Sequence, residues 1–419
     1  MPRFLLFLLS FPVLLPGQEA VSSHFVAVSG GQFTLNAQPY QYVGTNYWYA
    51  PFVAADAQGR ERIVRELDVL AEAGIANLRL MASGEGPARE PRRITPTLRE
   101  SPEAWNEDIA SGLDFVLAEM GKRQMKAVLC LNNFFYWSGG MAQYVSWFTG
   151  DPIPYPEENG WEAYMAYSAR FYGIKPAVQA YRQLISRLVT RRNSITGQLY
   201  RDDPTIMAWQ LANEPREFGH DKKYFRWVKR SLALIHQLDS RHLRCIGNEG
   251  ILDSRVGSTY ARTASLPHLD YLTVHLWPEN WGWYDPLRPD TTYPQAQKRA
   301  MAFLNANAEV AVEAGKPIVL EEFGLARDEG SCEARTPVSW RDRFYQFLHA
   351  YTLGTPTSPY QGLNFWAMGG EGSPRQAGQA WQPGDVYTGD PPHEKQGWYS
   401  VYFSDSTTMN WLQSLKKRL

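Results

Sequence analysis

The segment Ile206-Met207-Ala208-Trp209-Gln210-Leu211-Ala212-Asn213-Glu214-Pro215 runs from an apolar stretch into a polar triplet. Its apolar part, residues 206–211, has the length of a buried strand, and the Asn-Glu-Pro triplet places a carboxylate where that strand would end. A second apolar run, Pro317-Ile318-Val319-Leu320, stops in the same way at Glu321-Glu322-Phe323-Gly324. Both patterns predict a buried strand with a carboxylate at its end.

The rest of the chain repeats the alternation of strand and helix. Strand-length apolar runs occupy residues 42–46, 75–80, 127–131, 206–211, 244–247, 272–275, 318–321 and 363–366. Amphipathic stretches predict helices at 60–73, 103–123, 176–192, 222–238, 297–313, 340–353 and near 408–417, whereas the crossover between 247 and 271 lacks a clear helix. This alternation predicts the α/β class and a parallel (β/α)8 TIM barrel with long aromatic-rich βα loops. No linker marks a second domain, so we expect one barrel over residues 21–419.

Residues 1–20 predict a secretory signal peptide. Arg3 precedes an apolar run, residues 4–15, that is too short to span a bilayer, and Pro16-Gly17-Gln18-Glu19-Ala20 follows as a plausible cleavage region. We therefore expect a secreted or periplasmic protein. The net charge of −1 gives no electrostatic case for a nucleic acid or an anionic membrane as partner, and we expect a monomer. The three cysteines argue against a disulfide framework.

Active sites of parallel barrels lie at the carboxyl ends of the strands. The chemistry-bearing residues at these ends are Arg79, Asn132, Asn133, Asn213, Glu214, His275, Glu321, Glu322 and Trp366. Arg79 could instead be a structural ion-pair partner, and His275 a satisfied core histidine. Two carboxylates are what acid-assisted cleavage of a glycosidic bond requires, one to protonate the leaving oxygen and one to attack the sugar carbon. The sequence therefore predicts a glycosidase, with no metal or cofactor.

The strand-end residues resemble those of the retaining enzymes of glycoside hydrolase family 5. The resemblance rests on Asn-Glu-Pro at 213–215 and Glu-Phe-Gly at 322–324, and it runs from about Tyr42 to the C-terminus. Further motifs look like the β-mannanase branch and not the cellulases: Gly44-Thr45-Asn46-Tyr47-Trp48, Asn77-Leu78-Arg79, Asn132-Asn133, Trp137-Ser138-Gly139-Gly140 and Val274-His275-Leu276-Trp277.

The resemblance implies a role for each matching residue. Glu214 would be the acid/base and Glu322 the nucleophile. We expect Glu214 to be protonated at the start, because a charged Glu322 close by disfavours its ionisation. The other expected substrate-binding residues are Arg79 and His275, which would orient the carboxylates, Asn213 on the sugar 2-hydroxyl, Trp366 under the attacked sugar, and Asn133 and Trp277. Glu321 should point the other way, since adjacent strand residues face opposite sides.

Two positions depart from the family pattern. The family often carries a Tyr two residues after the strand-six His, where it bonds the nucleophile, but Trp277 stands there in this chain. An indole only donates and is larger, so a bond to Glu322 is in doubt. Many relatives also have a His at the end of strand three, where this chain has Asn132 and Asn133.

Whether the enzyme cuts inside chains or trims their ends depends on two long loops. Residues 134–173 are rich in Trp, Tyr and Phe, and residues 369–399 carry Trp381, Tyr387 and Trp398. These loops could extend an open cleft, or they could wall it off and leave a pocket for a terminal sugar. The sequence slightly favours a mannan endo-1,4-β-mannosidase over an exo-acting β-mannosidase on manno-oligosaccharides. A cellulase-type β-1,4-glucanase and a non-catalytic carbohydrate-binding protein are weaker alternatives.

Overall fold

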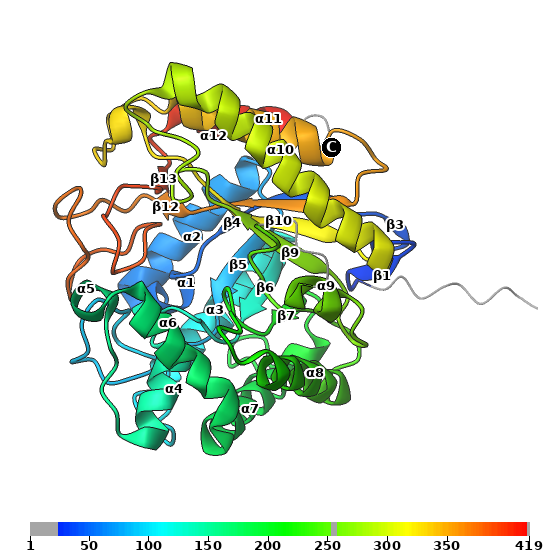
Figure 1. Ribbon diagram of the computed structural model, residues 1–419, viewed down its shortest axis with the longest axis vertical. Helices are drawn as coiled ribbons and strands as arrows, with labels where there is room; N and C mark the ends of the chain where they lie inside the picture. Colours follow the sequence, from blue (N-terminus) through cyan, green and yellow to red (C-terminus); the bar gives the residue numbers. More distant parts are fainter. Residues whose placement is uncertain (1–23, 253–257, 417–419) are drawn as a thin grey trace, which may run out of the picture.

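The core of the protein is a sheet of eight parallel strands that curls into a barrel surrounded by helices (Figure 1). The computed structural model describes residues 24–252 and 258–416. The strands are β4 (Tyr42–Asn46), β5 (Asn77–Met81), β6 (Lys126–Cys130), β7 (Ile206–Gln210), β8 (Leu243–Cys245), β9 (Leu272–Leu276), β10 (Ile318–Phe323) and β11 (Tyr360–Phe365). They lie in the order β8-β7-β6-β5-β4-β11-β10-β9. Backbone bonds from Asp270 N to Arg244 O and from His275 N to Glu249 O connect the two ends of this series, and the predicted TIM barrel is confirmed.

The helices that cover the barrel follow the predicted apolar spacing. They are α2 (Ala57–Glu72), α3 (Glu107–Lys122), α7 (Lys175–Val189), α8 (Asp221–Leu238), α10 (Pro289–Ala314), α11 (Ser339–Leu353) and α12 (Ser406–Lys416). The crossover between β8 and β9, for which we expected no clear helix, contains the short helix α9 (Thr259–Ala264). Ser258 caps α9, since its hydroxyl accepts a bond from Ala261 N (3.2 Å). Six residues are too few to reveal the periodicity on which the prediction relied.

Helix α8 illustrates how the helices are oriented. Its buried face carries Tyr224, Trp227, Val228, Leu232 and Ile235, and its exposed face carries Lys222, Lys223, Arg226, Lys229 and Arg230. An apolar stripe on one side and charges on the other hold such a helix against the barrel.

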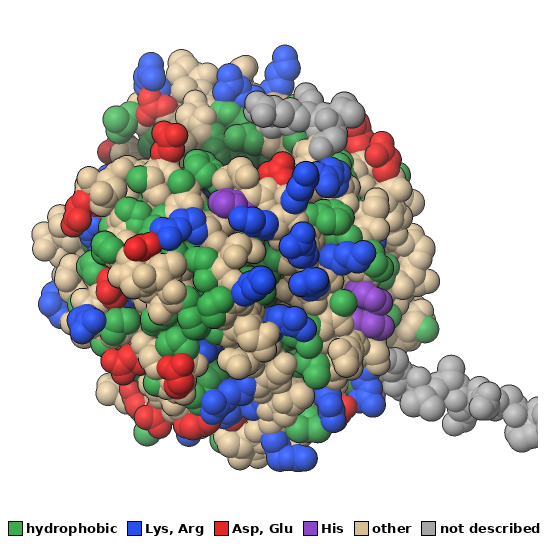
Figure 2. Space-filling view, turned by 60° about the horizontal axis from the view of Figure 1, so that its bottom comes forward, with side chains coloured by type: hydrophobic (Ala, Val, Ile, Leu, Met, Phe, Trp, Pro, Cys, Tyr) green, Lys and Arg blue, Asp and Glu red, His purple; other side chains and the backbone are tan. Residues whose placement is uncertain are grey.

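Figure 2 shows basic side chains gathering near the middle of one face of the molecule, with acidic ones mainly toward its rim.

The N-terminal end of the barrel has a cover that the sequence did not predict. It is a small antiparallel sheet of β1 (Ala27–Ser29), β2 (Gln32–Leu35) and β3 (Gln38–Pro39). Phe33 of this sheet packs edge-on against Tyr271, with ring centroids 5.3 Å apart. The bottom of the barrel is thereby closed by apolar contacts, and the polar strand ends lie at the opposite end.

Two long loops rise around the carboxyl ends of the strands. The insertion after β6 folds into α4 (Gly140–Thr149), α5 (Pro156–Asn159) and α6 (Trp161–Ala169). The segment after β11 leaves at β12 (Met368–Gly370) and returns at β13 (Val401–Tyr402), which pairs with β12. We call residues 371–400 the closing loop. The predicted signal peptide lies outside the described residues, and none of the helices within them is long and apolar enough to span a membrane.

Candidate active site

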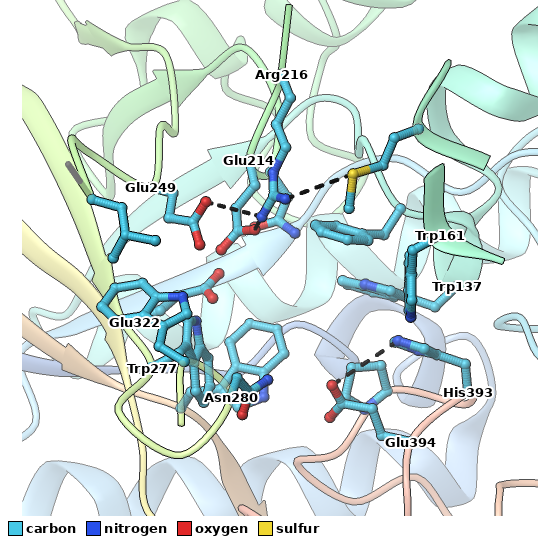
Figure 3. A pocket seen from close by; sticks show the side chains of 17 residues that line it. Trp137, Trp161, Glu214, Arg216, Glu249, Trp277, Asn280, Glu322, His393 and Glu394 are labelled. Atoms are coloured by element: carbon cyan, nitrogen blue, oxygen red, sulfur yellow. Dashed lines mark hydrogen bonds and ion pairs between the residues drawn. The ribbon is translucent and has the colours of Figure 1, made fainter. Parts of the chain in front are cut away.

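Glu214 and Glu322 lie together in a cavity of about 460 Å³ at the carboxyl ends of β7 and β10 (Figure 3). The cavity is lined by Phe135, Trp137, Trp161, Met165, Asn213, Glu214, Arg216, Glu249, Leu252, Trp277, Asn280, Trp281, Glu322, Trp366, Pro391, His393 and Glu394. Its size is that of a small-molecule site, and aromatic walls with a few converging polar groups are the usual composition of such sites.

The backbone of Glu214 is left-handed, with a φ of 43°. This conformation is uncommon for a residue with a Cβ atom, and it persists only where the surroundings fix it. Here Glu214 N donates to the carbonyl of Gly247 at 2.9 Å. The turn directs the carboxyl group to Nδ1 of His275, 2.7 Å away, and to Nη2 of Arg216, 3.1 Å away.

A register shift in β10 places the Glu322 carboxylate beside Glu214 in the cavity. Leu320 pairs with Val274 of β9 and Glu322 with His275, so one residue of β10 has no counterpart. Glu322 accepts a short bond from Arg79 Nη1 and lies 3.3 Å from His275 Nδ1. One carboxylate oxygen of Glu214 and one of Glu322 lie within 4.8 Å of each other.

Glu321 was expected to point the other way from Glu322, but the two side chains share their cationic partners. Its buried carboxylate accepts bonds from Gln210 Nε2 (2.6 and 2.8 Å) and lies 3.3 Å from His275 Nε2 and 3.4 Å from Arg79 Nε. The register shift between Leu320 and Glu322 is the physical reason, because an extra residue in one strand interrupts the alternation of sides. Glu321 therefore shares both cations with Glu322, although it does not line the cavity.

Arg79 connects the strand ends beneath the cavity. The residue is 3% exposed, and besides Glu322 it donates to Asn46 Oδ1 (2.9 Å), Gln210 Oε1 (2.8 Å) and Asn213 Oδ1 (2.8 Å). A guanidinium with this many partners fixes their relative positions. Arg79 thus lies where a residue that orients Glu322 and Asn213 should lie.

Asn133 and Asn132 lie next to Asn213, outside the residues that line the cavity. Asn133 Oδ1 accepts a bond from Asn213 Nδ2 at 3.1 Å, and Asn133 Nδ2 donates to Ser138 Oγ at 3.0 Å. Asn132 Oδ1 accepts a bond from Asn133 N at 2.8 Å. Neither residue is among those that line the cavity, and Asn133 contacts it through Asn213, which does line it.

His275 is a buried cation between the carboxylates. Burial alone would lower the pKa of the imidazole, but Glu322, Glu214 and Glu321 together raise this pKa to about 10. The ring is therefore an imidazolium at neutral pH, with each nitrogen donating toward a carboxylate. This arrangement is far from that of a histidine that only fills the core.

The two carboxyl groups have opposite pKa shifts. Burial would raise the pKa of Glu214, but His275 and Arg216 outweigh it and lower this pKa to about 2. Burial raises the pKa of Glu322 despite His275 and Arg79. We expected the proton on Glu214, whereas these shifts favour it on Glu322, because His275 and Arg216 lie against Glu214.

Trp277 and Trp366 form an aromatic corner of the cavity. Their rings lie edge to face with centroids 6.1 Å apart, and Trp277 also packs against Tyr399 at 5.0 Å. Within the described residues, the side-chain partners of Glu322 are Arg79 and His275, and Trp277 is not among them. The sequence left a hydrogen bond from the Trp277 indole to Glu322 in doubt, and the described residues contain no such bond.

Arg216 and Glu249 also line the cavity, although neither was predicted from the sequence. Arg216 Nη2 donates to Glu249 at 2.9 Å as well as to Glu214, so the three residues form a chain along one side of the cavity (Figure 3). Burial and the nearby Glu214 raise the pKa of Glu249 to about 7. Glu249 follows β8, so the strand-end rule that found Glu214 could have found it as well.

His393 and Glu394 of the closing loop line the opposite side of the cavity, and the sequence analysis missed them too (Figure 3). Within the described residues, His393 Nδ1 and Glu394 Oε2 are buried and have no hydrogen-bond partner. Burial raises the pKa of the Glu394 carboxyl well above its usual range and lowers the pKa of His393 to about 4. Buried polar atoms without partners are costly, and a ligand in the cavity would satisfy them.

Glu214, His275 and Glu322 also bring three potential metal-ligand atoms within 4.8 Å of one another. However, Arg79, Arg216 and the charged His275 already contact these carboxylates. A divalent ion would have to displace these cations, so we assign the cluster to acid/base chemistry.

Comparison with known proteins decides the family. Residues 23–419 match the family model described as "GH family 5 beta-mannosidase-like". The chain belongs to glycoside hydrolase family 5. It is therefore a glycosidase of the mannosidase and mannanase group, whose substrates are mannans or manno-oligosaccharides.

Two relatives cover most of the chain. The "Mannan endo-1,4-beta-mannosidase 1" of Arabidopsis thaliana is 30% identical over 392 residues, which are 88% of this chain and 87% of the relative. The "Glycoside Hydrolase Family 5 Mannosidase" of Rhizomucor miehei, solved in complex with mannosyl-fructose, is 37% identical with a TM-score of 0.87 and covers 94% of this chain and 97% of its own. The endo-1,4-β-mannanase of Rhizomucor miehei, at 22% identity and a TM-score of 0.69 over 94% of this chain and 100% of that one, shares the fold.

Proposed function

We propose that this family 5 enzyme is an exo-acting retaining β-mannosidase that releases one mannose at a time from the non-reducing ends of manno-oligosaccharides. This is the alternative that the sequence left open beside endo action. The observation that carries it is the closing loop, which brings His393 and Glu394 into the same cavity as Glu214 and Glu322.

The closing loop crosses the end of the cavity and contacts its surroundings on several sides. The ring of His393 packs against Tyr136 of the insertion after β6, with centroids 5.2 Å apart. At the other side, Trp398 Nε1 donates to Glu279 Oε1 (3.0 Å) and the Tyr399 hydroxyl to Asn280 Oδ1 (2.6 Å), both in the loop after β9. A chain of sugars could not continue through this wall without displacing these contacts.

Among the described residues, the cavity continues into a second one on the side that holds the acid/base. Glu214, Arg216 and Glu249 also line a second cavity of about 490 Å³. The leaving group of a glycosidase departs on the side of the group that protonates it. The closing loop bounds the pocket on one side of the attacked sugar, and the second cavity continues from it on the side of Glu214. This shape fits a substrate that enters by its non-reducing end.

The carboxylates support the retaining pathway. Retaining glycosidases hold their carboxyl groups about 5 to 5.5 Å apart, whereas inverting ones leave about 6.5 to 9.5 Å for a water molecule. The separation in this chain is compatible with the first class. Glu322 then attacks the anomeric carbon while Glu214 gives its proton to the glycosidic oxygen, and Glu214 afterwards takes a proton from the water that releases the sugar. In the reactive form, Glu214 carries a proton and Glu322 is ionised.

The remaining parts of the proposal concern substrate contacts and location. We assign Glu394 and His393 to hydroxyl groups of the terminal sugar, Asn213 to its 2-hydroxyl and Trp366 to its apolar face. The relative from Rhizomucor miehei bound to mannosyl-fructose supports a small mannoside as ligand. The signal peptide predicted at residues 1–20 supports an extracytoplasmic location, and we keep the expectation of a monomer.

Hydrolysis of linear mannan tests exo action. We expect mannose from the earliest time points and a slow fall in viscosity relative to the release of reducing ends, because each cut shortens a chain by one unit. A commercial endo-mannanase serves as the reference. A rapid loss of viscosity with mannobiose and mannotriose as first products would restore the endo assignment.

A further inference from the structure

A buried ion pair on α2 lies outside the catalytic chemistry described above. Arg62 Nε donates to Glu66 Oε1 at 2.9 Å, and the two side chains are 11% and 0% exposed. A buried pair is weak evidence for stability, because desolvation offsets most of the attraction between the charges. Its contacts with the closing loop suggest a different role.

The pair holds the outgoing end of the closing loop. Glu66 Oε1 accepts a bond from Glu371 N at 2.8 Å, and Arg62 Nη2 lies 3.5 Å from the carbonyl oxygen of Gly369. Gly370 has a φ of 62°, and a Cβ atom there would lie 2.0 Å from Glu66 Oε1. Only glycine lets the backbone approach the carboxylate this closely.

The same pair holds the returning part of the loop. Arg62 Nη2 donates to the carbonyl oxygen of Tyr387 at 3.0 Å. The Tyr387 ring stacks on Trp381 with centroids 4.8 Å apart, and its hydroxyl exchanges bonds with Thr95 N and O (2.9 and 3.0 Å). Two residues later, Gly389 O accepts a bond from Trp48 Nε1 at 2.8 Å. This stretch leads directly into His393 and Glu394.

The pair is also fixed from the barrel side. Glu66 Oε2 accepts a short bond from the hydroxyl of Tyr47, and Arg62 Nη2 lies 3.2 Å from the hydroxyl of Tyr49. Both tyrosines follow β4. One charged pair thus joins the barrel, the outgoing end of the loop and its returning part.

We propose that Arg62 and Glu66 are positioning residues that set the chain-end specificity by fastening the closing loop across the cavity. This rests on the proposed exo function. Neither residue touches the sugar. The closing loop forms the wall of the cavity. Arg62 and Glu66 supply the hydrogen bonds that hold the outgoing end and the returning part of this loop beside α2. Without them, His393 and Glu394 lose their fixed position and the cavity opens toward a longer chain of sugars.

The double variant Arg62→Met/Glu66→Leu tests this role. It removes the bonds to the loop and leaves no unpaired buried charge, a replacement that proteins often tolerate. We expect amide hydrogen exchange in residues 372–398 of the sugar-free enzyme to rise at least tenfold, with exchange in β6 and β7 unchanged. On linear mannan, we expect the ratio of viscosity loss to mannose release to rise at least tenfold.

The matched control is Arg65→Ala/Glu371→Ala. This pair joins the same helix to the same loop at 2.5 Å, but its side chains are 56% and 37% exposed, so we expect little change in exchange or products. Arg62→Lys, which keeps a positive charge beside Glu66 but removes the Nη2 that donates to the carbonyl oxygen of Tyr387, gives the same comparison if the double variant does not fold. Unchanged loop exchange and an unchanged product ratio in a folded variant would overturn the proposal. Hydrogen exchange in the sugar-free enzyme tests whether Arg62 and Glu66 hold the closing loop, and the products of the wild-type enzyme test exo action. The two proposals can therefore fail separately.

Discussion

Glu322→Ala should lower turnover by at least about 10⁴-fold on every mannoside, because no other group replaces the bond that it forms with the anomeric carbon. Glu214→Ala should be nearly as slow on mannobiose but should retain activity on aryl mannosides whose leaving group needs no proton. Initial rates on 2,4-dinitrophenyl β-mannoside and on mannobiose measure the difference.

Azide provides the control for these two roles. A small anion can enter the space left by Glu214→Ala and attack the glycosyl-enzyme without a general base, so added azide should rescue that variant and yield β-mannosyl azide. Azide should not rescue Glu322→Ala in this way. The matched neighbour is Glu321→Gln: if Glu321→Gln is inactive while Glu322→Ala keeps its activity, the nucleophile has been misassigned.

Glu394→Ala should lower kcat/KM for mannobiose by about tenfold, because burial keeps the Glu394 carboxyl neutral, a hydrogen bond between neutral groups is worth about 0.5 to 1.5 kcal/mol, and a tenfold change is about 1.4 kcal/mol. Part of the wall is removed as well, so the variant should release some mannobiose from mannohexaose. Steady-state kinetics on mannobiose and chromatography of early mannohexaose products measure both effects.

Glu371→Ala is the control for Glu394→Ala, since Glu371 is a carboxylate of the same loop that lies outside the cavity and pairs with the exposed Arg65. We expect nearly wild-type kinetics for it. Equal and small effects of both substitutions would show that Glu394 does not contact the sugar.

The barrel and the position of Glu214 and Glu322 at strand ends were predictable because both depend on local sequence. The spacing of apolar residues fixed the strands to within three residues of their observed ends. Glu214 stands out because a charge directly after an apolar strand is costly unless it is used. The same rule applied to the end of β8 would have indicated Glu249, which the sequence analysis left aside.

The features that escaped prediction depend on contacts between distant segments. His393 and Glu394 enter the cavity because the closing loop crosses to Tyr136 and Asn280, and no periodic pattern in a Gly- and Pro-rich loop specifies that path. The orientation of Glu321 depends on a register shift between β9 and β10. The opposite pKa shifts of Glu214 and Glu322 depend on His275 and Arg216, whose positions against Glu214 only the folded chain defines.

Digestion of mannohexaose that carries ¹⁸O at its reducing end tests the central claim most directly. Mass spectrometry of the first few per cent of products distinguishes the two ends of every fragment. Our account predicts unlabelled mannose and labelled mannopentaose as the first pair of products, because the substrate enters by its non-reducing end. Labelled mannobiose and mannotriose among the earliest products would contradict it.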